Sequence, residues 1–472
     1  MRCAPRNPRE ISSAFKVCVG GQVIMATTST QASACTNLMC SEPDSGNYFV
    51  STYPPFSTWT ADQIPAVQQR LETPTALTKD EPLGLYIHIP FCARRCHYCY
   101  YLSYAGRSSD DLDEYIECLL QELAMYRSAP ALGLRELSFV YFGGGTPSLL
   151  SESQLAHLLS GLQALYSWRH VEESTFECAP QSVTAPKLQL LRDMGITRIS
   201  LGVQDLNDEI LRLSGRVHLV EDVMRAYDLI RHVGFDVVNL DMIAGLCGQT
   251  DASFSSSIQR VIEIQPDCLT IYPLEIPHNT PLYRRLQTDA AGEHPASWDT
   301  KRARLATAFD QLEAAGYTMR SAYAAARDPH RQRFVYQDAQ YRGADLLGIG
   351  ASAFSYLAGT HSQNMPSLED YGACLRDRRL PLVRAYALTD DERLIREFIL
   401  HLKLGFADVG FFQKKFQTDI RERFARPLAS LQANGWLSVD RQGVRMTRQG
   451  LFLVDRLLSV FYLPQHQGLR YT

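Results

Sequence analysis

The sequence predicts an α/β protein: a partial (β/α)6 barrel of the TIM type, followed by a mostly helical, winged-helix-like domain. Between residues 83 and 322, short β-branched or aromatic runs alternate with longer amphipathic stretches. No hairpin signal joins these runs, which indicates parallel strands with helices packed outside them. Polar and glycine-rich residues follow several runs directly, as expected at the carboxyl ends of strands that carry a functional site.

The alternation resolves into six strand–helix units. The predicted strands are Leu85–Ile89, Leu137–Phe142, Ser174–Cys178, Arg198–Val203, Asp236–Ile243 and Cys268–Ile276. The predicted helices between them include Leu112–Tyr126, Ser153–Leu165, Ala185–Met194, Glu221–Val233 and Phe254–Ile264. Six units are fewer than the eight of a closed barrel, so the predicted sheet is open or only partly closed.

The pattern changes after about residue 378. Thr389-Asp-Asp-Glu392 is a capping box that opens a helix running through Leu404. Further helices are predicted at Phe411–Phe416 and Ile420–Ala433, a short hairpin over Trp436–Met446, and a last helix from Thr447. Helices followed by a hairpin are typical of winged-helix modules, which bind DNA in some proteins and act as lids or docking surfaces in others.

Length and composition limit the classes of protein. A chain of 472 residues exceeds what one core usually serves, so we expect an N-terminal extension over 1–82, largely disordered or a linker, a barrel over 83–378 and a C-terminal domain over 379–472. A net charge of -4 gives no basic excess for a nucleic-acid partner. No uncharged apolar run approaches the roughly 20 residues of a membrane span, so we expect no membrane partner.

The twelve cysteines and the N-terminus bear on location. No secretion signal accompanies the cysteines, which favours a reducing, cytoplasmic compartment. The first 40 residues carry Arg2, Arg6, Arg9 and Lys16 against the single acid Glu10. This composition fits a transit peptide and fits equally an over-long gene model with its true start at Met25.

The run Cys92-Ala-Arg-Arg-Cys96-His-Tyr-Cys99, directly after the first predicted strand, is the main chemical signal. Three thiolates at this spacing can hold three corners of a cubic iron–sulfur cluster and leave the fourth iron open for chemistry. A zinc ribbon would need a second Cys or His pair downstream, and the later cysteines are single. Taken alone, the three cysteines leave a cluster and the other roles of cysteine about equally open.

Other polar features follow the next four strands. Gly143-Gly-Gly-Thr-Pro147 follows the second strand, Glu177 ends the third, Gln204-Asp205 ends the fourth and Asp241 ends the fifth. Because the carboxyl ends of parallel strands meet at one edge, we expect these residues and the cysteines to converge on one rim.

Together these segments resemble the radical S-adenosylmethionine superfamily and, more narrowly, its oxygen-independent coproporphyrinogen III oxidase (HemN-like) family. The resemblance is carried by Tyr86-Ile-His-Ile-Pro-Phe-Cys92 with Cys96 and Cys99, by Gly143–Pro147, by Gly202-Val-Gln-Asp205 and by Asp241-Met-Ile-Ala-Gly245. It runs from about Tyr86 to the C-terminus, because the capped helix at Thr389 and the hairpin at Asn434-Gly-Trp436 also match.

The resemblance implies a [4Fe-4S] cluster ligated by Cys92, Cys96 and Cys99. S-adenosylmethionine would bind its open iron and, after one electron is injected, yield a 5′-deoxyadenosyl radical. The implied cofactor contacts are Tyr86, Tyr98, Gly143, Gly144, Gly145, Thr146, Glu177, Gln204, Arg216 and Asp241. A second S-adenosylmethionine is implied at Tyr272-Pro-Leu-Glu275 and Asp345–Phe354, with Tyr272, Glu275, Gly350 and Ala351 as contacts. The glycines at 143–145 have no Cβ, so their backbone can approach the methionine amino group of S-adenosylmethionine closely.

The sequence departs from the family at several positions. Tyr101 stands where coproporphyrinogen oxidases carry an extra Cys, Ala179 replaces an Asp, Cys247 replaces a Pro, and Glu275 stands where a small or neutral residue is usual. These changes favour a different substrate. We therefore expect methyl or methylene transfer to an sp² carbon, as in the methyltransferases and cyclopropanases of natural-product pathways. The alternatives are oxidative decarboxylation of coproporphyrinogen III and a heme-chaperone role.

The remaining expectations concern the base and the partners. Glu275 or His88 would remove a proton after radical addition, although His88 also reads as an ordinary buried strand histidine. The expected partners are a small aromatic or tetrapyrrole substrate, an electron donor such as flavodoxin or ferredoxin, and a partner methyltransferase.

Overall fold

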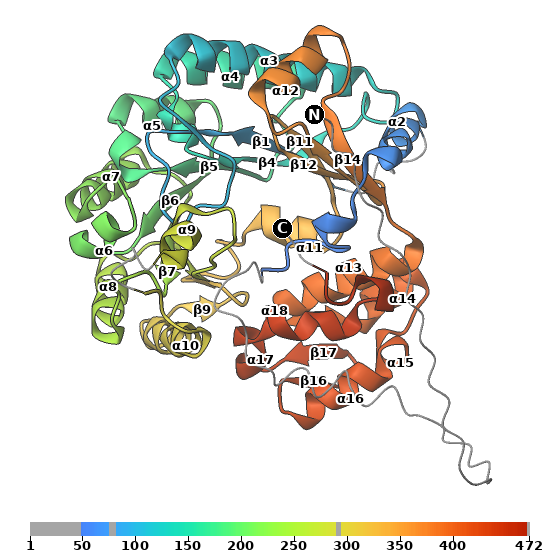
Figure 1. The fold of residues 1–472 in the computed structure, drawn as a ribbon. Helices are drawn as coiled ribbons and strands as arrows, with labels where there is room; N and C mark the ends of the chain where they lie inside the picture. The colour runs from blue at the N-terminus through green and yellow to red at the C-terminus, as the bar shows by residue number, and fades with distance from the viewer. Residues whose placement is uncertain (1–48, 75–81, 289–293, 470–472) are drawn as a thin grey trace, which may run out of the picture. The chain divides into compact units, whose positions relative to one another are not determined.

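The computed structural model describes residues 49–74, 82–288 and 294–469. Its main feature is a 12-stranded sheet with the order β14-β13-β12-β11-β1-β4-β5-β6-β7-β8-β10-β9 (Figure 1). The strands predicted from the sequence are present as β1 (Leu83–Ile89), β4 (Leu137–Gly144), β5 (Glu173–Cys178), β6 (Arg198–Gln204), β7 (Val237–Ala244) and β8 (Cys268–Pro273). The predicted α/β class is confirmed.

The centre of the sheet is parallel and buried on both faces. β1 pairs in parallel with β4 on one side and with β11 (Asp345–Ile349) on the other, and β4 to β8 continue in parallel. Six of the seven residues of β1 are buried, as expected for a strand covered on both faces. The predicted six-stranded core therefore gains a seventh parallel strand, β11, from a segment that lies far along the chain.

Antiparallel strands extend the sheet at both edges. β12 (Phe354–Leu357), β13 (Thr360–Asn364) and β14 (Leu382–Ala387) follow β11, while β10 (Ala324–Ala326) and β9 (Thr318–Met319) follow β8. β14 pairs with β13 within this sheet, although it lies beyond residue 379, where the C-terminal domain is predicted to begin.

Helices lie outside the parallel strands (Figure 1). The helices that follow the cysteine loop and strands β4 to β7 are α3 (Ser109–Ser128), α4 (Glu152–Leu165), α5 (Ala185–Asp193), α6 (Asp208–Leu213), α7 (Val220–Val233) and α8 (Asp251–Ile264). Capping boxes begin α3, α4 and α8 at Ser108, Ser151 and Thr250, where a side-chain oxygen satisfies an otherwise unpaired backbone N–H.

Residues 49–74 fold against the sheet and are not a free linker. They form η2 (Phe56–Thr58), η3 (Ala61–Gln63) and α2 (Ile64–Glu72). Thr60 pairs with Ala385 of β14 through two backbone hydrogen bonds of 2.9 and 3.0 Å, and the buried Trp59 stacks on His361. The rest of the predicted extension, including Met25 and the basic residues before it, lies outside the described residues.

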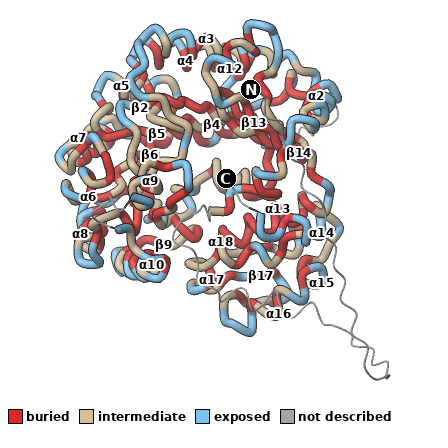
Figure 2. The backbone as a smooth tube through the Cα atoms, viewed as in Figure 1, coloured by how far each residue is buried: buried red, intermediate tan, exposed pale blue. Residues whose placement is uncertain are grey.

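The C-terminal domain has the predicted helix–hairpin pattern. Its helices are α13 (Asp390–Lys403), α14 (Val409–Phe416), α15 (Ile420–Arg423), α16 (Ala425–Ala433), α17 (Arg448–Phe452) and α18 (Val454–Leu457). A three-stranded sheet of β15 (Phe406–Asp408), β17 (Gly443–Met446) and β16 (Leu437–Val439) completes it. Thr389 forms the predicted capping box, and α13 is buried over most of its length (Figure 2).

No helix in the described part of the chain is both long and apolar enough to cross a bilayer.

Candidate active site

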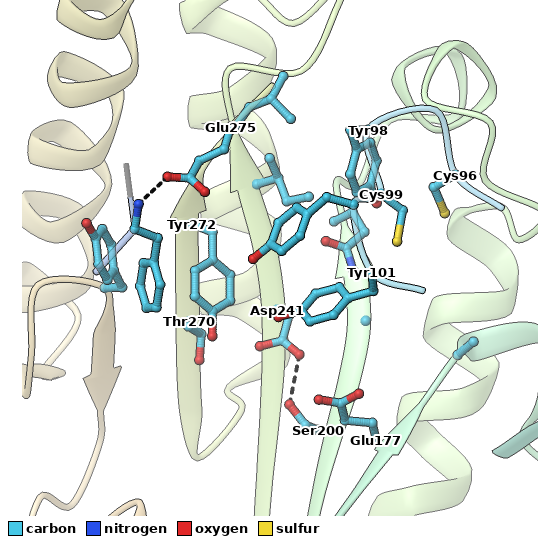
Figure 3. Close-up of a pocket in the computed structure, with 18 of the residues that line it drawn as sticks. Cys96, Tyr98, Cys99, Tyr101, Glu177, Ser200, Asp241, Thr270, Tyr272 and Glu275 are labelled. Atoms are coloured by element: carbon cyan, nitrogen blue, oxygen red, sulfur yellow. Dashed lines mark hydrogen bonds between the residues drawn. The ribbon is translucent and has the colours of Figure 1, made fainter. Parts of the chain in front are cut away.

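A cavity of about 370 Å³ lies at the carboxyl ends of the parallel strands (Figure 3). Of the predicted site residues, its wall includes Cys92, Cys96, Tyr98, Cys99, Gly144, Gly145, Thr146, Glu177, Gln204, Arg216, Asp241, Tyr272 and Glu275. The features that follow five successive strands therefore converge as expected from strand polarity.

The cysteine loop is held by hydrogen bonds to its own backbone and to two neighbouring side chains. Cys99 N–H donates to the Cys96 carbonyl at 3.2 Å, and Arg95 Nη2 donates to the Cys99 carbonyl at 2.9 Å. Thr146 Oγ1 lies 3.5 Å from Cys92 Sγ, and Arg216 Nη1 lies 3.2 Å from Cys96 Sγ. Two of the three sulfurs thus face hydrogen-bond donors.

Two of the three thiols hold their protons more tightly than an exposed thiol does. Burial raises the pKa of Cys92, and burial together with the neighbouring Cys96 raises the pKa of Cys99 to about 12. A thiol with such a pKa stays protonated at neutral pH unless a metal takes the place of the proton. The loop therefore favours thiolates only in the presence of a bound cation.

The arrangement fits a cluster better than a single ion. Among the described residues, no group of three His, Cys, Asp or Glu side chains could hold one metal ion. A cubic cluster places its irons at separate corners, so its ligands need not meet at one point. Two buried polar atoms at the loop, Tyr98 Oη and Arg216 Nε, also have no hydrogen-bond partner among the residues that the structure describes, and a bound ligand would satisfy them.

The glycine loop packs directly against the start of the cysteine loop. Gly145 N–H donates to the Ile89 carbonyl and Thr146 N–H to the Phe91 carbonyl, both at 2.8 Å. Gly144 has φ +110°, a conformation that favours glycine, and a Cβ on Gly145 would lie 2.7 Å from the Phe91 carbonyl oxygen. Side chains are therefore excluded here, and the backbone itself forms the cavity wall.

Two carboxyl groups lie deeper in the cavity. Tyr141 Oη donates to Glu177 Oε1 at 2.6 Å, while Asp241 accepts from Ser200 Oγ at 2.8 Å and from Asn239 Nδ2 at 2.9 Å. Burial raises the pKa of Glu177 to about 7 and raises that of Asp241 above its usual range. Both groups are held in fixed positions by donors, as acceptors for ligand hydroxyl or amino groups need to be.

Gln204 lies at the distorted end of β6, which Arg216 contacts from the turn after α6. Gln204 has φ +72° next to an irregularity in the pairing of β6 with β7. Non-glycine residues adopt this conformation at an energetic cost, and such strain is concentrated at functional sites. Arg216 Nη2 donates to the Gly202 carbonyl at 2.8 Å, which fixes its guanidinium beside Cys96.

Other predicted residues lie behind the cavity wall. His88 Nδ1 lies 3.0 Å from Tyr86 Oη, and the His88 ring packs over Gly144. Neither His88 nor Tyr86 lines the cavity. Burial lowers the pKa of His88 to about 4, so its imidazole is neutral. Gly143 is likewise outside the lining, because the Tyr141 ring covers it.

Gly350 and Ala351 also lie away from the cavity. Gly350 N–H donates to Glu122 Oε2 at 2.8 Å and Ala351 N–H to Tyr115 Oη at 2.9 Å, and Ala351 is fully buried. These contacts hold the end of β11 beside β1. The predicted contact of Gly350 and Ala351 with a second S-adenosylmethionine stays a prediction.

The sequence did not indicate the far wall of the cavity, which comes from four separate segments. Its members include Phe49, Arg302, Tyr323, Asp455 and Arg456. Glu275 accepts a hydrogen bond from Phe49 N–H (Figure 3). Asp455 accepts from Val50 N–H at 2.7 Å and from Lys403 Nζ at 2.6 Å, and Tyr323 Oη also donates to it. None of these residues stands in a motif, so no local pattern could have found them.

Tyr101 projects into the cavity (Figure 3). Its ring stacks on Tyr100 with centroids 4.6 Å apart, and 49% of its surface is exposed. Tyr272 on the opposite side is 39% exposed. The cavity therefore offers two accessible aromatic faces for a ligand.

Comparison with known proteins gives consistent matches. The family model described as the radical SAM superfamily matches residues 86–261, and the HemN C-terminal domain model matches residues 388–453. The oxygen-independent coproporphyrinogen III oxidase of Escherichia coli (strain K12) is 30% identical over 403 residues, which cover 82% of this chain and 87% of that protein. The heme chaperone HemW of Bacillus subtilis (strain 168) is 28% identical over 381 residues, covering 80% of this chain and 98% of that protein.

A solved structure agrees with the fold. The coproporphyrinogen III oxidase (HemN) of Escherichia coli superposes with a TM-score of 0.76 at 28% sequence identity, covering 88% of this chain and 96% of that one.

Proposed function

Because the chain belongs to the HemN-like family of radical S-adenosylmethionine proteins, we propose that it is an enzyme that oxidatively decarboxylates a porphyrinogen propionate, with coproporphyrinogen III as the substrate. The main expectation from the sequence, methyl or methylene transfer, is supported less well, because the relatives described above are named as coproporphyrinogen oxidases and a heme chaperone. Their names support a tetrapyrrole as the ligand.

One observation carries the proposal: the cavity continues from the cysteine loop to a far wall that contains Arg302 and Arg456. A porphyrinogen is large and carries several carboxylates, and guanidinium groups bind carboxylates through paired hydrogen bonds. One propionate at these arginines would leave another near the reactive centre, beside Tyr101 and Tyr272.

When bound, a [4Fe-4S] cluster with S-adenosylmethionine would supply abstraction of one hydrogen atom from the propionate side chain; release of CO2 to form the vinyl group would then pass one electron to an external electron acceptor. The chain holds and orients these groups. Cys92, Cys96 and Cys99 ligate the cluster, while the backbone at Gly144 and the side chains of Glu177, Gln204, Arg216 and Asp241 bind the cofactor. Tyr98, within the cysteine loop, packs against the apolar cluster that contains Ile210 and Leu274 and would help to exclude water from the bound cofactor.

Methyl or methylene transfer is the second candidate, and Tyr101 is the observation that favours it. The ring of Tyr101 occupies cavity volume where the resembling oxidases carry the smaller Cys. A second S-adenosylmethionine beside Tyr272 and Glu275 would then donate the carbon. Glu275 already accepts a backbone hydrogen bond from Phe49, which keeps its carboxylate oriented toward the far wall.

The test is a product assay with anaerobically reconstituted protein, dithionite, S-adenosylmethionine and coproporphyrinogen III. We expect 5′-deoxyadenosine together with decarboxylated, vinyl-bearing porphyrinogen, detected by liquid chromatography and mass spectrometry. 5′-Deoxyadenosine with S-adenosylhomocysteine and no decarboxylation would replace the proposal by methyl transfer. Tight heme binding with neither product would replace it by a carrier role.

A further inference from the structure

His218 is a fully buried histidine that stands in none of the motifs quoted above and is outside the cavity lining. It lies in the turn between α6 and α7, two residues after Arg216. The residue between them, Val217, is 48% exposed, so the turn directs His218 inward and its neighbour toward solvent. Both nitrogens of a buried imidazole need hydrogen-bond partners, and these partners indicate what His218 does.

The two partners of His218 fix its tautomer. Nε2 lies 3.1 Å from the Val203 carbonyl oxygen, and Nδ1 lies 3.2 Å from Arg216 Nη2. A carbonyl oxygen can only accept a hydrogen bond, and a guanidinium group can only donate one. The ring proton is therefore on Nε2, and Nδ1 accepts a hydrogen bond from Arg216.

The imidazole of His218 is neutral, as this hydrogen bond requires. Burial, together with the positive charge of Arg216, lowers the pKa of His218 to about 3. The Val203 carbonyl and the carboxylates of Asp222 and Asp208 raise this pKa, but burial outweighs them. A protonated ring would present a second N–H to the guanidinium group and could not accept from it.

The irregular end of β6 supplies the backbone acceptors for this pair of side chains. The register of β6 against β7 shifts between Gly202 and Gln204, and Val203 lies at this irregularity. The Gly202 carbonyl accepts from Arg216 Nη2 at 2.8 Å. The next carbonyl, that of Val203, accepts from His218. Irregularities of this kind occur next to active sites, where they redirect chain groups, and this one brings both side chains to the same strand end.

Arg216 in turn reaches the cysteine loop. Its Nη1 lies 3.2 Å from Cys96 Sγ, while its Nη2 donates to the Gly202 carbonyl and to His218 Nδ1. The guanidinium group is planar and rigid, so two acceptors at one of its nitrogens fix the direction of the other. The orientation of Arg216 toward Cys96 therefore depends on His218.

We propose that His218 is a positioning residue that holds the Arg216 guanidinium group against Cys96 and thereby raises the reduction potential of the cluster. The inference rests on the proposed role of Cys96 as a cluster ligand. Hydrogen bonds to the ligand sulfurs, and the residues that orient their donors, tune the potential of iron–sulfur clusters. A cationic donor at Cys96 favours the more negative, reduced cluster. His218 itself exchanges neither a proton nor an electron.

The competing explanation is a purely structural role, in which His218 only fastens the turn to β6. The two roles use different ring nitrogens. Nε2 donates to Val203 and fastens the turn, whereas Nδ1 accepts from Arg216 and orients it. Side chains that reproduce only one of these nitrogens therefore separate the two roles.

Three variants of His218 make this separation. His218→Asn places an amide oxygen at the position of Nδ1, and His218→Gln places an amide N–H at the position of Nε2. His218→Phe keeps the aromatic volume and removes both nitrogens. The matched control is His361→Phe, because His361 on β13 is also buried and its Nε2 lies 3.2 Å from the Tyr53 carbonyl, but it is outside the cavity lining.

The midpoint potential of the reconstituted cluster is measured by redox titration followed by electron paramagnetic resonance, without substrate or S-adenosylmethionine. We expect His218→Phe and His218→Gln to lower the equilibrium constant for one-electron reduction about fivefold to tenfold, which is a potential about 40 to 60 mV lower. His218→Asn should keep the wild-type potential. His361→Phe should lower the urea unfolding midpoint and leave the potential unchanged.

A double variant completes the test. Arg216→Gln/His218→Phe should have the potential of Arg216→Gln alone, because His218 acts only through Arg216. An unchanged potential in His218→Phe, an equal shift in His218→Asn, additive shifts in the double variant or a shift in the control would each overturn the proposal. Loss of iron from every His218 variant, with full iron in the control, would also overturn it. The titration needs no turnover, so failure of the proposed reaction would be seen separately.

Discussion

The two walls of the cavity are built in different ways. The cluster-side wall comes from loops that follow consecutive strands, and its residues stand in short motifs such as Cys92–Cys99 and Gly143–Pro147. The far wall is assembled from Phe49 before the barrel, Tyr323 at its edge strands and Asp455 in the C-terminal domain. A sequence motif can predict the functional residues of a single loop. It cannot predict a cavity wall that forms only when segments distant in the sequence pack together.

The largest effect should come from the cluster-side wall. Replacing Cys92, Cys96 or Cys99 by Ala should remove the cluster, so iron content falls from about four per chain to a small fraction and 5′-deoxyadenosine formation stops. Iron analysis and absorbance spectroscopy check this. Cys118→Ala, in α3 and outside the cavity, is the matched control and should keep its iron. A full cluster in a single-Cys variant would remove that residue from the ligand set.

The far wall should respond in stability while the cluster is retained. Lys403 and Asp455 form an ion pair of 2.6 Å with side chains 2% and 8% exposed. Lys403→Met leaves the Asp455 charge buried beside Val50 and Tyr323 and should cost about 3 to 5 kcal/mol of unfolding free energy. Urea unfolding of the apoprotein measures it.

A double variant sharpens that test. Lys403→Met/Asp455→Leu removes both charges and should recover part of the loss, because neither buried charge is then unpaired. Reconstituted iron content should match wild type in both variants. Loss of the cluster on changing Lys403 would mean that the two walls are not independent.

A buried carboxyl outside both walls gives a pH signature. Glu122 accepts from Gly350 N–H, Asn364 Nδ2 and Tyr371 Oη, and burial raises its pKa to about 7. The folded state therefore holds this proton more tightly than the unfolded state, where a Glu titrates near 4.5. The stability contribution is full below about pH 4.5 and is lost as pH rises through about 7.

Glu122→Gln removes that titration. The unfolding free energy of the variant relative to wild type should rise between pH 5 and pH 8, by up to about 3 kcal/mol. Urea unfolding at the two pH values checks this. A difference that stays constant with pH would show that Glu122 does not titrate in this range.

The smallest effect should be on the potential of the cluster. Arg216 Nη1 lies 3.2 Å from Cys96 Sγ, and a cationic donor to a ligand sulfur stabilises the more negative, reduced cluster. Arg216→Gln should lower the reduction potential by about 60 mV, equivalent to one hydrogen bond of about 1.4 kcal/mol. Arg216→Lys, which keeps the charge, should shift it less. Redox titration followed by electron paramagnetic resonance measures both, and equal potentials in all three proteins would contradict the assigned role.

The same contrast explains what the sequence could predict. Six strands, their helices and the capping box at Thr389 are local patterns, and the structure confirms them. β11 was not clearly predicted, because Asp345–Ile349 becomes a strand only by pairing with β1 more than 250 residues earlier.

Local reasoning also could not separate residues that face the cavity from those just behind it. His88 lies between the buried residues Ile87 and Ile89 on β1, and its ring lies under Gly144. Tyr101, two residues past the last predicted ligand, faces the cavity instead. Side-chain direction in a loop is set by what packs around it, and that information is not in the spacing of the motif.

The position of Asp455 also fixes an order of events during synthesis. The cysteine loop leaves the ribosome more than 350 residues before Asp455, a delay of roughly 20 to 70 s at ordinary rates of translation. During that time Val50 and Tyr323 lack their shared acceptor, so the far wall is incomplete while the cluster ligands are already available. A factor that delivered iron and sulfur during this time would meet an incomplete cavity, which is completed only once α18 has been synthesised.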